Sequence, residues 1–228
     1  MRFTGAMKTS IVLPLVAAVL TSCAVGLWNA RSEFDLGAEL FNRGQYAEAI
    51  PHFQAASELD PKFAQAHLYL GRCYVSLGRY LEAIPPLRTA YSLSPQEVGK
   101  EALNILLDAL LRVAISEVQK GNFEGALGHL KDALNLDPGS RQVKEELSRT
   151  LISFGGQLLM KGNLSGAIDR YTDALSYAPD NVGAYMGLAR AFLQRGDVKK
   201  AIEAWQGASK IDPGNKDLPN LLRELMTK

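Results

Sequence analysis

Residues of the same kind recur along this chain at fixed intervals, and this internal repetition limits its possible folds more than any other feature. Five prolines are separated by 34, 43, 41 and 34 residues, and five glycines repeat at the same four intervals. The prolines are Pro61, Pro95, Pro138, Pro179 and Pro213, and the glycines are Gly44, Gly78, Gly121, Gly162 and Gly196. Repetition with a period of about 20–50 residues is typical of arrays in which each unit packs against its neighbours.

Four more sets of residues follow the same intervals and indicate pairs of antiparallel helices. Two sets are alanine throughout, one holds only glycine or alanine, and one holds only large apolar residues. The small set is Gly37, Gly71, Ala114, Gly155 and Ala189, and the large set is Phe53, Leu87, Leu130, Tyr171 and Trp205. Small residues allow two helices to approach closely, and the large residue fills the groove against the next pair. The repeated glycine ends one helix in a left-handed turn, and the proline stops the other.

This pattern resembles the 34-residue tetratricopeptide repeat (TPR) over roughly residues 30–213. The resemblance implies an all-α, right-handed superhelical solenoid of five hairpins with a C-terminal capping helix, eleven helices in all. We expect the TPR domain at residues 32–228. Its repeats are expected at about 30–63, 64–97, 98–140, 141–181 and 182–215, and the cap at 216–228.

Two intervals are longer than the family's repeat, by nine and seven residues. The extra residues lie between Pro95 and Ala114 and between Pro138 and Gly155, in segments that lack proline and alternate charge with leucine. They therefore predict that helix A, the first helix of a repeat, is longer in repeats three and four, whereas helix B, the second, keeps its length. Nine helical residues add about 13 Å, so we expect these helices to project beyond the hairpin edge. The projecting turns form either a second contact surface or a pair of overhangs packed on each other.

The N-terminal residues have the pattern of a secretory signal peptide, in which basic residues precede a short apolar segment. Arg2 and Lys8 come before Ile11–Leu20, which contains ten apolar residues and no charge. Residues 20–23 read Leu-Thr-Ser-Cys, which resembles the bacterial lipobox. That resemblance implies removal of residues 1–22, lipidation of Cys23 and a short tether over 23–31. Two acyl chains would hold the protein on a membrane more firmly than one.

An uncleaved membrane anchor is the alternative for the same segment. The charge-free stretch Ile11–Trp28 is 18 residues long, at the lower limit of about 17–25 for a spanning helix. Both interpretations place the rest of the chain in the cell envelope, facing the periplasm. Ala24 follows the cysteine in place of the aspartate that holds lipoproteins in the inner membrane of enteric bacteria. This favours the outer membrane over the inner.

A partner-binding groove is implied by the resemblance, because A helices line the concave face of TPR proteins. Counting from the start of each repeat gives the groove residues Phe34, Phe41, Leu68, Tyr69, Arg72, Leu111, Arg112, Ile115, Ile152, Met186 and Arg190. An apolar helix or an extended tail would suit such a groove, with the arginines meeting acidic groups. The alternative is that many of these side chains simply pack between neighbouring A helices.

Composition and motifs favour no catalytic or nucleic-acid-binding function. The formal net charge is +1, from 25 basic and 24 acidic residues, which gives no attraction to nucleic acid. The sequence shows no catalytic set, phosphate-binding loop or metal-ligand spacing. We therefore expect no catalytic residue, cofactor, metal or small-molecule substrate. Cys73 lies inside a predicted A helix, where a buried structural thiol is expected.

The sequence thus predicts a protein-interaction scaffold or adaptor, anchored to a bacterial membrane and binding a protein partner through the groove. The alternative is a structural subunit of an envelope, secretion or pilus complex, docked through the long A helices. In architecture and anchoring the chain is similar to TPR lipoproteins such as the pilotins of type IV pilus secretins. An enzyme is the least favoured class.

Overall fold

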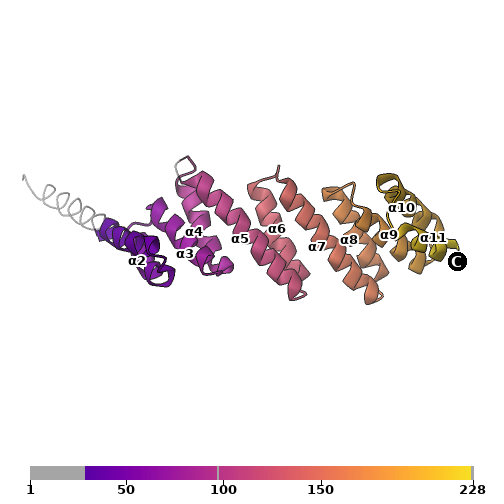
Figure 1. The fold of residues 1–228 in the computed structure, drawn as a ribbon, viewed down its shortest axis with the longest axis horizontal. Coiled ribbons are helices and arrows are strands. Elements are labelled where there is room, and N and C mark those ends of the chain that lie inside the picture. Colours follow the sequence, from indigo (N-terminus) through magenta and orange to yellow (C-terminus); the bar gives the residue numbers. More distant parts are fainter. Residues whose placement is uncertain (1–28, 97, 227–228) are drawn as a thin grey trace, which may run out of the picture. The chain divides into compact units, whose positions relative to one another are not determined.

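The computed structural model describes residues 29–96 and 98–226, except the side chains of 221, 222, 224 and 225. This part of the chain forms eleven helices and no strand, as expected (Figure 1). The first helix includes residues 29–42. The others are α2 (Tyr46–Leu59), α3 (Ala64–Ser76), α4 (Tyr80–Leu93), α5 (Gly99–Gln119), α6 (Phe123–Leu136), α7 (Arg141–Met160), α8 (Leu164–Tyr177), α9 (Val182–Arg195), α10 (Val198–Ile211) and α11 (Leu218–Met226).

The chain divides into two compact units, and the boundary lies between Ala109 and Leu110, inside α5. In the first unit α2 packs against α3, and α3 packs against α4. In the second unit each helix from α6 to α11 packs against the next one in the chain, and α7 also contacts α9. This order, in which consecutive hairpins lie side by side, is that of a helical repeat protein.

The five repeated glycines form the hairpin turns, as the sequence predicts. Their φ angles lie between 72° and 87°, in the left-handed region that glycine adopts without steric cost. In the second hairpin, Gly78 is followed by a backbone hydrogen bond of 2.8 Å from the N–H of Arg79 to the carbonyl oxygen of Tyr74. This bond closes the helix end in the way of a Schellman motif.

The repeated prolines stop the B helices, also as predicted. Helices α2, α4, α6, α8 and α10 each have 14 residues. Each of them ends two residues before its proline, as α4 does at Leu93 before Pro95. Pro51 lies inside α2, and Pro85 and Pro86 lie inside α4, without ending either helix.

The small and large residue sets meet in the core of each hairpin. A methyl group added at Gly71 would lie 2.5 Å from Cγ of Leu87, so α3 and α4 can pack this closely only without a side chain there. Tyr171 of α8 covers Gly155 of its own hairpin and Gly187 of the next one. The large residue therefore fills the space towards the following hairpin, as expected.

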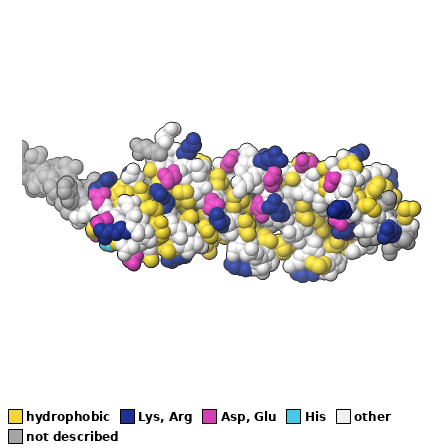
Figure 2. Space-filling model, in the orientation of Figure 1, with side chains coloured by type: hydrophobic (Ala, Val, Ile, Leu, Met, Phe, Trp, Pro, Cys, Tyr) yellow, Lys and Arg dark blue, Asp and Glu magenta, His cyan; other side chains and the backbone are white. Residues whose placement is uncertain are grey.

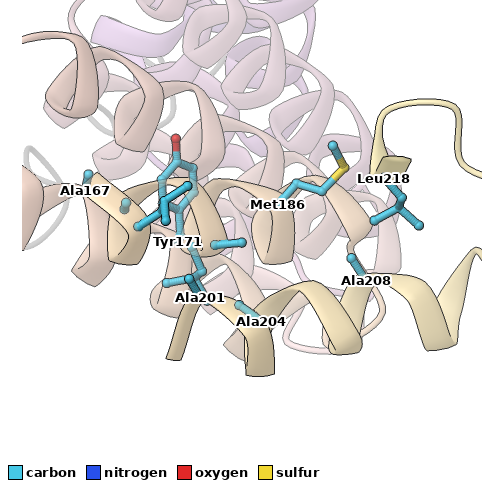
Figure 3. Close-up of a cluster of buried hydrophobic side chains, with 11 residues drawn as sticks. Ala167, Tyr171, Met186, Ala201, Ala204, Ala208 and Leu218 are labelled. Atoms are coloured by element: carbon cyan, nitrogen blue, oxygen red, sulfur yellow. The ribbon is translucent and has the colours of Figure 1, made fainter. Parts of the chain in front are cut away.

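The C-terminal helix α11 caps the array. Leu218 is 3% exposed, and its carbonyl oxygen accepts a hydrogen bond of 3.2 Å from the indole Nε1 of Trp205. Figure 3 shows Leu218 at the edge of the buried cluster that it completes, together with Ala167, Tyr171, Met186, Ala201, Ala204 and Ala208. This helix covers apolar surface of the fifth hairpin that water would otherwise reach.

The A helices of repeats three and four are long, with 21 residues in α5 and 20 in α7 against 13 in α3 and 14 in α9. Their added turns contain buried side chains. Ala102 and Leu106 in α5 are 0% exposed, and Val143 and Leu147 in α7 are 1% and 0% exposed. No large apolar side chain of residues 99–106 or 141–147 is among the exposed ones of the described chain. These turns therefore bury their apolar side chains.

Candidate protein-binding face

Aromatic side chains gather on the A-helix face of the first unit, where the first helix lies beside α3. Phe34 is buried, and its ring centroid lies 5.5 Å from that of Phe53, 4.9 Å from that of Phe63 and 5.4 Å from that of Tyr69. Phe41 and Tyr69 are half-buried and meet edge-on at 5.2 Å. Such edge-on pairs are favoured because the positive ring edge meets the negative ring face.

Arg72 extends this cluster and gives it a charge. The guanidinium carbon of Arg72 lies 4.8 Å from the ring centroid of Phe41 and 4.8 Å from that of Tyr69. Both distances are within cation–π range. Nη1 of Arg72 also lies 3.3 Å from Oε1 of Glu101, on α5. The side chain of Arg72 remains 32% exposed, so this cation is fixed by its neighbours and still reaches water.

Helical spacing explains why these groups converge. Tyr69 and Arg72 are three residues apart on α3, and Phe34 and Phe41 are seven residues apart on the first helix, so each pair lies along one helix face. We define the Arg72 site as Phe41, Tyr69, Arg72 and Glu101. Its two rings, one cation and one carboxylate can hold an apolar side chain next to a charged group.

The structure buries other predicted groove residues. Leu68 is 2% exposed, Leu111 8% and Met186 7%, and Met186 belongs to the core cluster of the second unit. Ile152 is half-buried and packs against the same cluster. For these four residues, packing between helices accounts for the apolar character that the sequence shows.

Arg112, Ile115 and Arg190 are the predicted groove residues of the second unit whose side chains are exposed. Ile115 is 43% exposed. Arg190 lowers the pKa of the Tyr171 hydroxyl, but burial has the larger effect and raises that pKa overall.

Sequence reasoning missed Glu101, which lies in the added turns of α5, and a hollow on the second unit. That hollow has a volume of about 490 Å³ and is lined by residues of α6, α7 and α8. Phe154 of α7 lines it and stacks on Phe123 at 5.1 Å and 3°. Gly128 of α6 also lines it, and an added methyl group there would meet no described atom within 4 Å.

Charged and apolar side chains are interspersed on the face shown in Figure 2.

Cys73 has the buried thiol expected from the sequence. Its side chain is 0% exposed, and burial raises the thiol pKa to about 12, although the charge of Arg72 acts in the opposite direction. A thiol with so high a pKa is a poor nucleophile. Among the described residues, no group of three or more His, Cys, Asp or Glu could hold a metal ion.

The predicted signal peptide (1–22), Cys23 and the alternative anchor Ile11–Trp28 lie outside the described residues. Within residues 29–96 and 98–226, none of the helices combines the length and apolar character that crossing a bilayer requires.

Comparison with known proteins identifies the class. Two models of the tetratricopeptide repeat match residues 34–98 and 158–225, which together make up more than half of the chain. The chain therefore belongs to the tetratricopeptide-repeat family. TPR proteins generally mediate protein–protein interaction, and the fold is a typical non-catalytic interaction scaffold.

The chain is also similar to solved structures, one of them with a TM-score above 0.5. A TPR-repeat protein from Bacteroides fragilis (BF2334) has a TM-score of 0.66 at 14% identity, over 87% of this chain and 98% of that one. PilF of Pseudomonas aeruginosa has a TM-score of 0.40 at 16% identity, over 87% and 83%. TTC0263 of Thermus thermophilus has a TM-score of 0.35 at 23% identity, over 86% and 99%. No curated protein sequence matched the chain.

Proposed function

We propose that this protein is an interaction scaffold of the bacterial cell envelope that binds a segment of a partner protein through the A-helix face of its first unit. The observation that carries this proposal is the Arg72 site. There, two half-buried rings and a 32% exposed guanidinium lie on one face of the first helix and α3. Aromatic residues and arginine are enriched among the residues that dominate protein interfaces.

The same side chains are poorly explained by stability alone. Phe34 and Phe53 are buried and form the core beneath the face, whereas Phe41 and Tyr69 keep part of their rings in contact with water. A partner side chain that covers these rings would remove further apolar area from water, worth about 25 cal/mol for each Å². The rings are already held in place, so binding costs little ordering of the protein.

We further propose that the chain is tethered by lipid at Cys23 after removal of residues 1–22, and faces the periplasm from the outer membrane. The support is the sequence Leu20-Thr21-Ser22-Cys23 after a basic and then an apolar segment, with alanine next to the cysteine. An uncleaved anchor over Ile11–Trp28 would put the TPR repeats in the same compartment.

The burial of the added turns bears on the alternative, a permanent subunit of an envelope, secretion or pilus assembly. That function would use the long A helices as a docking surface. Because Ala102, Leu106, Val143 and Leu147 are buried, these turns offer little apolar surface to a second protein. The observation therefore favours an adaptor that binds through the Arg72 site.

A comparison of two truncations tests the function. Phe41→Ala removes a ring from the binding face, and Leu81→Ala removes a side chain that is 61% exposed on α4 of the same unit. Each full-length variant is used to recover proteins from solubilised native membranes, with quantification by mass spectrometry. We expect a protein that the wild type and Leu81→Ala recover equally and that Phe41→Ala loses, at unchanged helical content. Equal recovery by all three forms would contradict the proposal.

A further inference from the structure

We propose that the Arg72 site recognises an Asp or Glu side chain that stands next to an apolar residue of the partner. In the free protein Glu101 forms an ion pair with Arg72, and the partner's carboxylate displaces it. The inference rests on the proposed function and adds the chemistry of the bound segment and a competitor within the chain. It follows from how Arg72 is held, from the weakness of its pairing with Glu101, and from where Glu101 lies.

The guanidinium of Arg72 is held in position before any partner arrives. Its carbon is 4.8 Å from the ring centroids of both Phe41 and Tyr69. These contacts engage the guanidinium through electrostatic attraction to the ring faces and leave its N–H groups available for hydrogen bonds. Because the planar guanidinium can donate two parallel hydrogen bonds to one carboxylate, a fixed arginine favours that group over a neutral one.

The carboxylate that now faces Arg72 is held weakly. A single contact of 3.3 Å joins Nη1 of Arg72 to Oε1 of Glu101. Strong charge-assisted hydrogen bonds between these groups measure about 2.7–2.9 Å. The Glu101 side chain is 51% exposed, and an ion pair in such contact with water contributes about 0–1 kcal/mol. A second carboxylate that aligns better can therefore replace it at small cost.

Glu101 is present at this place because of the longer third repeat. Helix α3 begins seven residues before Gly71, whereas α5 begins 15 residues before Ala114, the equivalent position. Glu101 lies within those added turns. In the free protein the ion-pair partner of Arg72 is thus a glutamate side chain, which shows that the site accepts a side-chain carboxylate. The rings beside it offer apolar surface to the residue next to that carboxylate.

Peptide selection on the full-length protein in detergent micelles tests the inference. A phage library of random 12-residue peptides, fused so that the peptide has no free C-terminus, is selected on the wild type and on the Phe41→Ala variant. We expect wild-type binders to contain Asp or Glu beside an aliphatic or aromatic residue. One binder is then synthesised with an amidated C-terminus, together with its Asp→Asn or Glu→Gln form.

Three comparisons of affinity decide the outcome. Loss of the peptide carboxylate should weaken binding to the wild type about tenfold or more, the usual worth of a hydrogen bond to a charged group. It should matter little to Arg72→Met, which removes the cation that the peptide carboxylate would meet. Glu101→Gln should tighten binding about two- to fivefold, since it removes a competitor worth up to about 1 kcal/mol. Circular dichroism should show that both variants remain as helical as the wild type.

Each negative result would contradict a different claim: the carboxylate recognition, the role of Glu101 or the proposed function. Apolar binders that need Phe41 but no acidic residue would overturn the carboxylate inference and leave the proposed function standing. An equal loss of affinity for the neutral peptide on the wild type and on Arg72→Met would also overturn it. An unchanged or weaker affinity of Glu101→Gln would remove Glu101 as a competitor and make it a structural link between α3 and α5. A library that yields no peptide preferring the wild type over Phe41→Ala would contradict the proposed function itself.

Discussion

The guanidinium of Arg72 lies 3.3 Å from the carboxylate of Glu101, although one residue stands in the middle of α3 and the other in the added turns of α5. This pair joins two features that set the chain apart from a regular repeat array, the cluster of aromatic side chains around Arg72 and the lengthened third repeat. Since both side chains remain partly exposed, the pair can exchange partners without disturbing the core beneath it.

Two glycine-to-alanine changes should affect stability in opposite directions. Gly71→Ala places a methyl group 2.5 Å from Leu87, so overpacking should lower the free energy of unfolding by about 1–3 kcal/mol. Gly128→Ala meets no described atom within 4 Å, so the better helix propensity of alanine in α6 should raise it by up to about 1 kcal/mol. Chemical denaturation of both variants measures the difference. Equal effects would mean that packing at Gly71 does not limit the approach of α3 and α4.

Leu111 and Ile115 lie one helical turn apart in α5 and should respond differently to a charge. Leu111 is 8% exposed, so Leu111→Glu buries an unpaired carboxylate and should cost about 3–5 kcal/mol of stability. Ile115 is 43% exposed, so Ile115→Glu should leave the melting temperature and helical content close to those of the wild type. Thermal melts followed by circular dichroism give the comparison. A stable Leu111→Glu variant would show that Leu111 is accessible after all.

The thiol of Cys73 should resist modification in the folded protein. With a pKa of about 12, only about one molecule in 10,000 carries the thiolate at pH 8, and the sulfur is buried as well. Labelling with a maleimide, followed by mass spectrometry of the peptide that contains Cys73, should show modification only after denaturant is added. Rapid labelling of the native protein would mean that this part of α3 opens readily.

The same thiol should make stability depend on pH in the alkaline range. The pKa of a cysteine in the unfolded chain is about 8.5, so the folded state holds this proton more firmly. The resulting contribution to stability is complete below about pH 8.5 and is lost as pH rises towards 12. Cys73→Ala should therefore lose less stability than the wild type between these values in parallel denaturation experiments. An equal change in stability with pH for the two proteins would contradict a raised pKa of Cys73.

Lipid attachment at Cys23 has a direct test. Growth of the native host with a clickable fatty acid should label the wild type, and Cys23→Ser should abolish both the label and the removal of residues 1–22. A Cys23→Ser protein that behaves like the wild type in size and membrane retention would instead support the uncleaved anchor over Ile11–Trp28.

The sequence predicts those features of the structure that are determined by residues close together in the chain. Gly78 and Pro95 act on their own stretch of backbone, so the ends of α3 and α4 follow from the sequence alone. The burial of Leu68 and Met186 does not, because a position on a helix face says nothing about which neighbour covers it. The contact between Glu101 and Arg72 depends on how an inserted turn packs, and residue spacing carries no such information.

The central claim is that a partner protein binds the A-helix face of the first unit, and photocrosslinking in cells tests it most directly. A benzophenone amino acid replaces either Ala38, between Phe34 and Phe41 on that face, or Glu58, exposed on α2 of the same unit. We predict a discrete adduct from position 38 that is absent from position 58 and is strongly reduced when Arg72→Met is added. Adducts of equal yield at the two positions, or an adduct at position 38 that is insensitive to Arg72, would contradict the claim.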